Sequence, residues 1–167
     1  AIKLRQYGPL SPVVDPVMIA KGGSALMHPD ALDTLKREII PLSYVLTPNI
    51  PEAETIAEMS INGPADMKKA AEAIHSLGAQ NVLVKGGHLP GDAEDILFDG
   101  ERFYSYRNKR IPSKNTHGTG CTLSSAITAN LASGMGVADA VRSAKTYITA
   151  AIEHTLPIGK GNGPANH

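Results

Sequence analysis

The sequence predicts an α/β fold in which helices cover a largely parallel sheet. Short apolar segments of strand type alternate along the chain with longer segments whose apolar residues recur at helical spacing, and this alternation is typical of the class. Glycine, proline and aspartate separate many of the segments, as expected at turns. The length of 167 residues suits one domain, residues 1–167, with a sizeable core.

Short apolar segments are predicted to form the strands. Those of the parallel sheet are residues 13–14 (Val-Val), 44–46 (Tyr-Val-Leu) and 81–85 (Asn-Val-Leu-Val-Lys). Residues 96–98 and 102–106 flank Asp99-Gly100, which predicts a hairpin with an Asp-Gly turn.

Segments with helical periodicity lie between the strands. The predicted helices cover residues 30–40, 52–59, 65–77, 121–132 and 137–154. In the third of these, Ala70, Ile74 and Leu77 are expected to share the buried face, and Gly78 is expected to end the helix.

Charge and composition narrow the class of protein. Sixteen basic and sixteen acidic residues cancel, so there is no electrostatic case for a nucleic-acid or anionic membrane partner. The single cysteine excludes a disulfide within the chain, which favours a reducing compartment. No apolar run approaches the ~20 residues that span a bilayer, and the first residues lack the apolar core of a signal peptide. We therefore expect a cytoplasmic chain without a membrane or nucleic-acid partner.

Polar residues follow each predicted parallel strand. They are Asp15 after the first, Thr47, Asn49 and Glu52 after the second, and residues 85–88 (Lys-Gly-Gly-His) at the third. Because the carboxyl ends of parallel strands share one edge of a sheet, and ligands bind beyond that edge, we expect these residues to share a rim. Each has an ordinary alternative, such as a solvated lysine or a simple bend, and only their convergence indicates a site.

Residues 116–122 (Thr-His-Gly-Thr-Gly-Cys-Thr) lie just before the predicted helix 121–132. Gly118 and Gly120 carry no side chain, so the backbone there can approach a ligand closely. The free N–H groups and the dipole at a helix start favour an anion. A Gly-X-Gly before a helix is weak evidence alone, but beside the rim residues it indicates phosphoryl transfer.

Four segments resemble a known family. Residues 15–18 (Asp-Pro-Val-Met), 47–52 (Thr-Pro-Asn-Ile-Pro-Glu), 85–88 and 117–122 (His-Gly-Thr-Gly-Cys-Thr) resemble, in order, the signature segments of hydroxymethylpyrimidine/phosphomethylpyrimidine kinases. The end of the chain, residues 161–167, is also similar to that family. The resemblance implies a three-layer ribokinase-like fold and ATP-dependent phosphorylation of 4-amino-5-hydroxymethyl-2-methylpyrimidine and its monophosphate in thiamine biosynthesis. It also implies a homodimer. Only the C-terminal part of the family is matched, so we expect the N-terminal strands and much of the pyrimidine pocket to be missing, and the chain to be incomplete as an enzyme.

The resemblance implies roles for individual residues. An anion hole at the transferred phosphoryl group would be formed by Gly118, Thr119, Gly120 and Cys121, with Cys121 also contacting the substrate. ATP would be bound by Thr47, Asn49, Lys85, Gly87 and Lys145. Asp15 and Glu52 would hold Mg²⁺, and Val17 would pack on the pyrimidine ring.

Cys121 stands where sugar kinases of the superfamily carry an aspartate that deprotonates the acceptor hydroxyl. A phosphomonoester, whose second pKa is near ~6, is mostly dianionic at neutral pH and needs no base. A carboxylate would repel it. We hypothesise that a thiol suits an enzyme that phosphorylates both an alcohol and its monophosphate.

Three other functions stay open at this point. A pyridoxal kinase of the same branch is the nearest, because the residues that choose between the two rings lie largely in the part of the family that the chain does not cover. A non-catalytic pyrimidine-binding relative would have little use for Mg²⁺-binding groups. A dinucleotide-binding oxidoreductase would need Gly-X-Gly-X-X-Gly spacing, which is lacking. Residues 102–110 fit a solvated hairpin better than a partner surface or a flap over the nucleotide.

Overall fold

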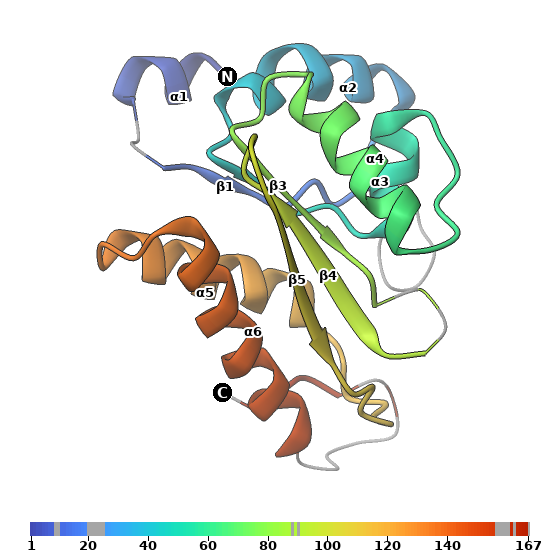
Figure 1. Cartoon of the computed structure of the whole chain (residues 1–167). Coiled ribbons are helices and arrows are strands. Elements are labelled where there is room, and N and C mark those ends of the chain that lie inside the picture. Colours follow the sequence, from blue (N-terminus) through green and yellow to red (C-terminus); the bar gives the residue numbers. More distant parts are fainter. Residues whose placement is uncertain are drawn as a thin grey trace.

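In a computed structural model, which describes residues 1–8, 11–19, 26–87, 89, 91–155, 161 and 163–166, a five-stranded sheet lies between two layers of helices (Figure 1). The strands, in spatial and chain order, are β1 (Val13–Val14), β2 (Val45–Leu46), β3 (Asn81–Lys85), β4 (Ala93–Phe98) and β5 (Phe103–Asn108). No helix in this part of the chain is both long and apolar enough to cross a membrane.

The sheet is parallel except for one strand. β1 pairs with β2 and β2 with β3 in parallel, whereas β4 runs antiparallel to both β3 and β5. β5 therefore has the direction of β1, β2 and β3, which confirms the predicted, largely parallel sheet. The predicted hairpin is also confirmed. Its loop is Asp99–Arg102, because Phe98 pairs with Phe103, and the Asp99 carboxylate accepts hydrogen bonds from the backbone N–H groups of Glu101 and Arg102.

The helices divide between the two faces of the sheet (Figure 1). On one face lie α2 (Pro29–Thr34), α3 (Ile50–Ala57) and α4 (Pro64–His75), and on the other α5 (Thr119–Ala132) and α6 (Val137–Glu153). A short helix that was not predicted, α1 (Ile2–Tyr7), buries none of its residues and contacts the rest through an ion pair between Arg5 and Glu38.

Alternation along the strands builds a core on each face. In β3, Val82 and Val84 point toward α3 and α4, whereas Leu83 points toward α5 and α6. In β4, Ile96 and Leu97 divide in the same way, and all five side chains are fully buried. Each sheet face is therefore sealed by its own helices, as the three-layer prediction requires.

Two helix ends differ from the sequence expectations. The predicted helix 30–40 is α2 followed by a π-helical turn (Leu35–Ile39) and a 3-10 turn (Ile40–Leu42), which accommodates Pro41. The expectation that Leu77 is buried is wrong, because α4 ends at His75 and leaves Leu77 37% exposed. Gly78 follows with φ of 108°, a conformation suited to glycine, as expected at the end of a helix.

Candidate active site

Four polar side chains form a row that follows the order of the strands. Asp15 comes just after β1, Thr47 just after β2, Lys85 ends β3 and Asp95 lies within β4. Each is an even number of residues from a neighbour that packs under α5 and α6, namely Val13, Val45, Leu83 and Leu97. Because side chains alternate along a strand, the row faces the layer formed by α5 and α6.

An ion pair joins the first and third residues of the row. Lys85 Nζ is 2.7 Å from Asp15 Oδ1, and both side chains are only 15% exposed. The hydroxyl group of Thr47 donates to the same oxygen at 3.1 Å. The three residues that the sequence placed at neighbouring strand ends are therefore in direct contact.

The N-terminus of α5 reaches this ion pair. Gly118 caps the helix with φ of 78°, and no side chain in the described part of the chain caps it by a hydrogen bond. A Cβ atom on Gly120 would lie 3.4 Å from Lys85 Nζ and 3.6 Å from Asp15 Oδ2, so glycine permits the close approach. The helix is held there by Ser124, whose Oγ is 3.1 Å from Thr47 Oγ1. The predicted anion-binding junction and the predicted rim thus meet.

Glu52 and Asn49 form a capping box at the start of α3. Asn49 Oδ1 accepts from the backbone N–H of Glu52 at 3.0 Å, and Glu52 Oε2 accepts from the backbone N–H of Asn49 at 2.8 Å. Burial raises the pKa of Glu52 and the nearby charge of Asp15 raises it further, while the Asn49 N–H and the charge of Lys85 lower it. A second cation near Glu52, in addition to Lys85, would stabilise its ionised form.

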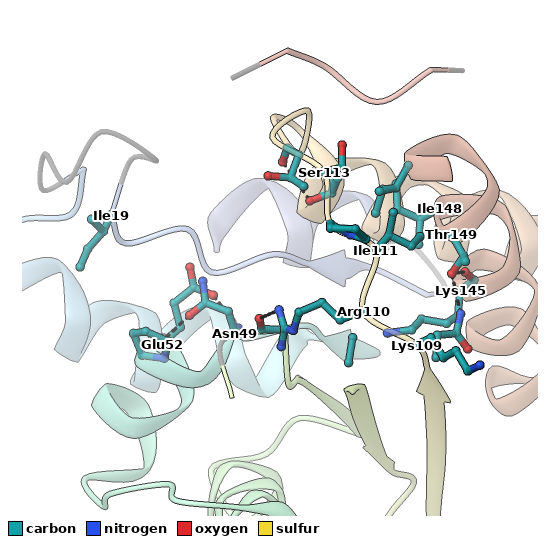
Figure 2. Close-up of a pocket in the computed structure, with 18 residues that line it drawn as sticks. Ile19, Asn49, Glu52, Lys109, Arg110, Ile111, Ser113, Lys145, Ile148 and Thr149 are labelled. Atoms are coloured by element: carbon teal, nitrogen blue, oxygen red, sulfur yellow. Dashed lines mark hydrogen bonds between the residues drawn. The ribbon is translucent and has the colours of Figure 1, made fainter. Parts of the chain in front are cut away.

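A cleft of about 920 Å³ extends from Asn49 and Glu52 to α6 (Figure 2). Figure 2 shows Lys145 and Ile148 on the far side, with Arg110 between the two groups. Its lining combines charged side chains with an apolar wall made by Ile111, Pro112, Ile148 and Ile152. Such a combination suits a ligand with one charged and one apolar part.

The predicted site residues divide between the cleft, the row of polar side chains described above and other surfaces. Those that line the cleft are Asn49, Glu52, Gly87, Thr119 and Lys145. Thr47, predicted to bind ATP, is fully buried and contacts Asp15 and Ser124 instead. Val17 is 39% exposed. Cys121 is exposed and lines a separate groove between α5 and α6. His88 lies outside the described residues.

Three residues of the site were missed by sequence reasoning. Ser124 fixes α5 to β2, and Asp95 accepts a hydrogen bond from Lys145. Arg110 donates to the backbone carbonyl groups of Gly87, Leu89 and Gly91 at 2.9, 2.5 and 2.8 Å. The expectation of a solvated hairpin at residues 102–110 is therefore incomplete, because its end lines the cleft. The signal that could have identified Asp95 is its place two residues before Leu97 in β4, which puts an acidic side chain on the same face of the sheet as that buried leucine.

The sequence matches those of known kinases over almost the whole chain. A family profile described as phosphomethylpyrimidine kinase matches residues 1–166. The chain is 52% identical over its whole length to the thiamine biosynthesis bifunctional protein ThiED of Geobacter sulfurreducens, and 48% identical to the hydroxymethylpyrimidine/phosphomethylpyrimidine kinase of Bacillus subtilis. It spans 34% of the first relative's length and 62% of the second's.

Solved structures of two kinases share the fold. The ADP complex of Bacillus subtilis pyridoxal kinase superposes on 99% of the chain with a TM-score of 0.89 at 37% identity, and the chain covers 62% of it. Phosphomethylpyrimidine kinase from Clostridium difficile superposes on 90% with a TM-score of 0.78 at 47% identity, and the chain covers 61% of it. The ribokinase-like fold implied by the sequence is confirmed. The chain belongs to the phosphomethylpyrimidine kinase family.

Proposed function

We propose that the chain carries the ATP-binding and phosphoryl-transfer part of a kinase for 4-amino-5-hydroxymethyl-2-methylpyrimidine and its monophosphate. The observation that carries this proposal is the start of α5, which meets the partly buried Lys85–Asp15 pair through Gly120 near one end of the cleft. The names of the relatives support the substrate and the pathway, thiamine biosynthesis. We extend the proposal to a cytoplasmic homodimer, as the family resemblance implies.

ATP would lie along the cleft. The flat adenine ring of ATP would pack on the apolar wall that includes Ile111 and Ile148. The ammonium group of Lys145 would contact the negatively charged phosphates. The γ-phosphoryl group would then point toward the N-terminus of α5. The N–H groups of residues 118–121 are oriented in advance toward the charge that develops during transfer, and such preorganised donors usually provide the largest catalytic contribution.

Asp15 and Glu52 suit a magnesium ion. Mg²⁺ prefers carboxylate oxygens and keeps several of its waters, so two carboxylates suffice. Burial is the main cause that raises the pKa of Glu52, and the charge of Asp15 adds to it; a cation bound between the two carboxylates would offset both effects. When bound, Mg²⁺ neutralises phosphate charge. Lys85 holds the Asp15 carboxylate in place from the other side.

The acceptor would approach from the side of Val17 and Cys121. Val17 offers a half-exposed apolar surface, and Cys121 presents its side chain in the first turn of α5. For the monophosphate, no protein base is needed because the acceptor oxygen is already ionised. Replacing Cys121 by Asp is expected to reduce the second phosphorylation more than the first, and equal losses would overturn this role.

Pyridoxal kinase is the second candidate. Several solved structures with this name, including one from Staphylococcus aureus in complex with AMP-PCP, superpose with TM-scores of 0.85 to 0.90 but at only 33% to 37% identity. The curated relatives named as pyrimidine kinases reach 48% and 49%. The pyrimidine is therefore the favoured acceptor, and a non-catalytic relative is disfavoured by the intact Asp15, Glu52 and Lys85.

An assay of ATP consumption by the purified chain tests the proposal, after its intact mass has been verified. The acceptors are hydroxymethylpyrimidine, its monophosphate and pyridoxal, each with and without Mg²⁺. Turnover of the monophosphate supports the proposal, and turnover of pyridoxal alone favours the second candidate. Binding of MgATP without turnover would place only the nucleotide part of the site in this chain. Failure to bind MgATP would overturn the proposal.

A further inference from the structure

Asp95 is a buried carboxylate that contacts two parts of the cleft without lining it. Its side chain is 6% exposed. One oxygen, Oδ1, accepts from the backbone N–H of Gly86 at 3.0 Å, and the other, Oδ2, accepts from the ammonium group of Lys145. Both oxygens are therefore used, one by the turn after β3 and one by α6.

The turn that Asp95 contacts has no freedom to shift toward β4. A Cβ atom on Gly86 would lie 1.9 Å from the carbonyl oxygen of Glu94, so the backbone of the turn presses directly on the strand. The next residue, Gly87, lines the cleft. A hydrogen bond from Gly86 to Asp95 thus fixes the backbone where the chain enters the cleft wall.

Asp95 also separates two lysines that both belong to the site. Lys85 and Asp95 are directly opposite on neighbouring strands, so their Cβ atoms are about 4.5–5.5 Å apart. Lys85 pairs with Asp15 on its other side, and Asp95 pairs with Lys145. Negative and positive side chains therefore alternate across the sheet from Asp15 through Lys85 to Asp95, and the series continues to Lys145 on α6. Each lysine has its own acidic partner, and the two ammonium groups are held at different points.

We propose that Asp95 is a positioning residue for nucleotide binding, which rests on the function proposed above. It holds the Lys145 ammonium group at the wall of the cleft and locks the Gly86–Gly87 turn beside it. Lys145 is 12% exposed and would otherwise extend into solvent or toward the other carboxylates. The phosphates of ATP would then meet a fixed charge rather than a mobile one, which reduces the entropy lost on binding.

Asp95→Asn tests this role, with Glu94→Gln as the matched control. Asparagine keeps an oxygen acceptor for Gly86 but loses the charge that holds Lys145. Glu94 is the adjacent residue of β4 and pairs with Arg107 and Ser105 instead. Affinities for ATP and for adenosine are measured by calorimetry or competition. We expect Asp95→Asn to weaken ATP binding by about tenfold, the effect of one hydrogen bond to a charged group, and to leave adenosine binding unchanged.

A second measurement follows Lys145 without any nucleotide. Acetic anhydride labels lysines, and peptide mass spectrometry gives the rate at each one. Lys145 should react slowly in the wild type and in Glu94→Gln, and faster in Asp95→Asn because the amine is released from its partner. Lys145→Met should by itself weaken ATP binding as much as Asp95→Asn, and the double variant should be little worse than either single variant.

The outcomes separate this inference from the proposed function. If the wild type binds no ATP, the proposed function of the chain fails, and the labelling rate of Lys145 still decides whether Asp95 holds it. If the wild type binds ATP and Asp95→Asn binds it equally well, the inference is overturned. Equal losses of ATP and adenosine affinity would indicate a purely structural role and overturn it as well. Should Asp95→Asn fail to fold, unchanged ATP affinity in Lys145→Met would overturn it.

Discussion

At the scale of single residues, Gly86 and Gly87 are adjacent but have opposite surroundings. A Cβ atom on Gly86 would overlap the Glu94 carbonyl oxygen at 1.9 Å, whereas one on Gly87 would meet nothing within 4 Å. Because backbone cannot move aside as a flexible side chain can, the first position is closed to any other residue. At Gly87, a side chain would extend into the open space of the cleft.

We therefore expect Gly86→Ala to lower the free energy of unfolding by about 3 kcal/mol or more, through overpacking against β4. Gly87→Ala should leave stability nearly unchanged and weaken ATP binding, because its methyl group would occupy the cleft. Urea unfolding and ATP titration of both variants check this. Similar stability losses in the two variants would contradict it.

Glu52 makes stability depend on pH in a defined direction. Burial raises its pKa above the ordinary 4.5, so the folded protein holds this proton to a higher pH than the unfolded chain does. Its favourable contribution is complete below the ordinary pKa and is lost as the pH rises through the raised pKa. Glu52→Gln should thus be more stable than the wild type at neutral pH, and the difference should close in acid.

Thermal unfolding across pH measures this difference, with the exposed Glu101→Gln as the control. A stability gap between wild type and Glu52→Gln that stays constant with pH, or widens in acid, would show that the burial of Glu52 does not govern its titration.

At the scale of secondary-structure elements, the capping box of α3 sets where that helix begins. Asn49 and Glu52 bond to each other's backbone N–H groups, and the helix that follows packs against α4 and β3. The same two side chains line the cleft, so the start of α3 is both a helix cap and a wall of the site.

Asn49→Ala should destabilise the protein by about 1 kcal/mol, the usual value of an N-cap, which lowers Tm by roughly 2–4 °C for a chain of this size. Asn49→Asp should retain nearly all the stability, because aspartate caps as well as asparagine. Calorimetry distinguishes the two. A loss in Asn49→Asp equal to that in Asn49→Ala would mean that the amide group matters for something other than capping.

The sequence predicts elements better than it predicts contacts. Leu123 and Ile127 recur at helical spacing, so α5 was predictable, and parallel topology places Asp15 and Lys85 at one edge before any distance is known. The partnership of Asp95 with Lys145 was not, because the two are 50 residues apart and meet only through the packing of α6 over β4. Burial of Leu77 was misjudged because periodicity continues past the residue where a helix ends.

At the scale of the whole molecule, ligand binding is linked to stability. A ligand that binds only the folded state at a concentration of 100 times its Kd adds about 2.7 kcal/mol. With roughly 2–4 °C per kcal/mol, saturating MgATP should raise Tm by about 5–10 °C. In Glu52→Gln, ATP should still raise Tm, but Mg²⁺ should add nothing further, because one of its two proposed ligands is gone. An equal Mg²⁺ increment in both proteins would exclude Glu52 as a ligand.

The alternation of charge across the sheet also bears on how fast a ligand arrives. Asp15, Lys85, Asp95 and Lys145 sum to zero, and the whole chain has a formal net charge of +0. The whole chain supplies no net field, and an excess of positive charge is found only in the lining of the cleft, where Lys109, Arg110 and Lys145 outnumber Glu52. Attraction of ATP is therefore expected to act only close to the cleft, and the association rate constant measured by stopped flow should fall only modestly as ionic strength rises. Specificity for the nucleotide would then be determined after contact, by its dissociation rate constant.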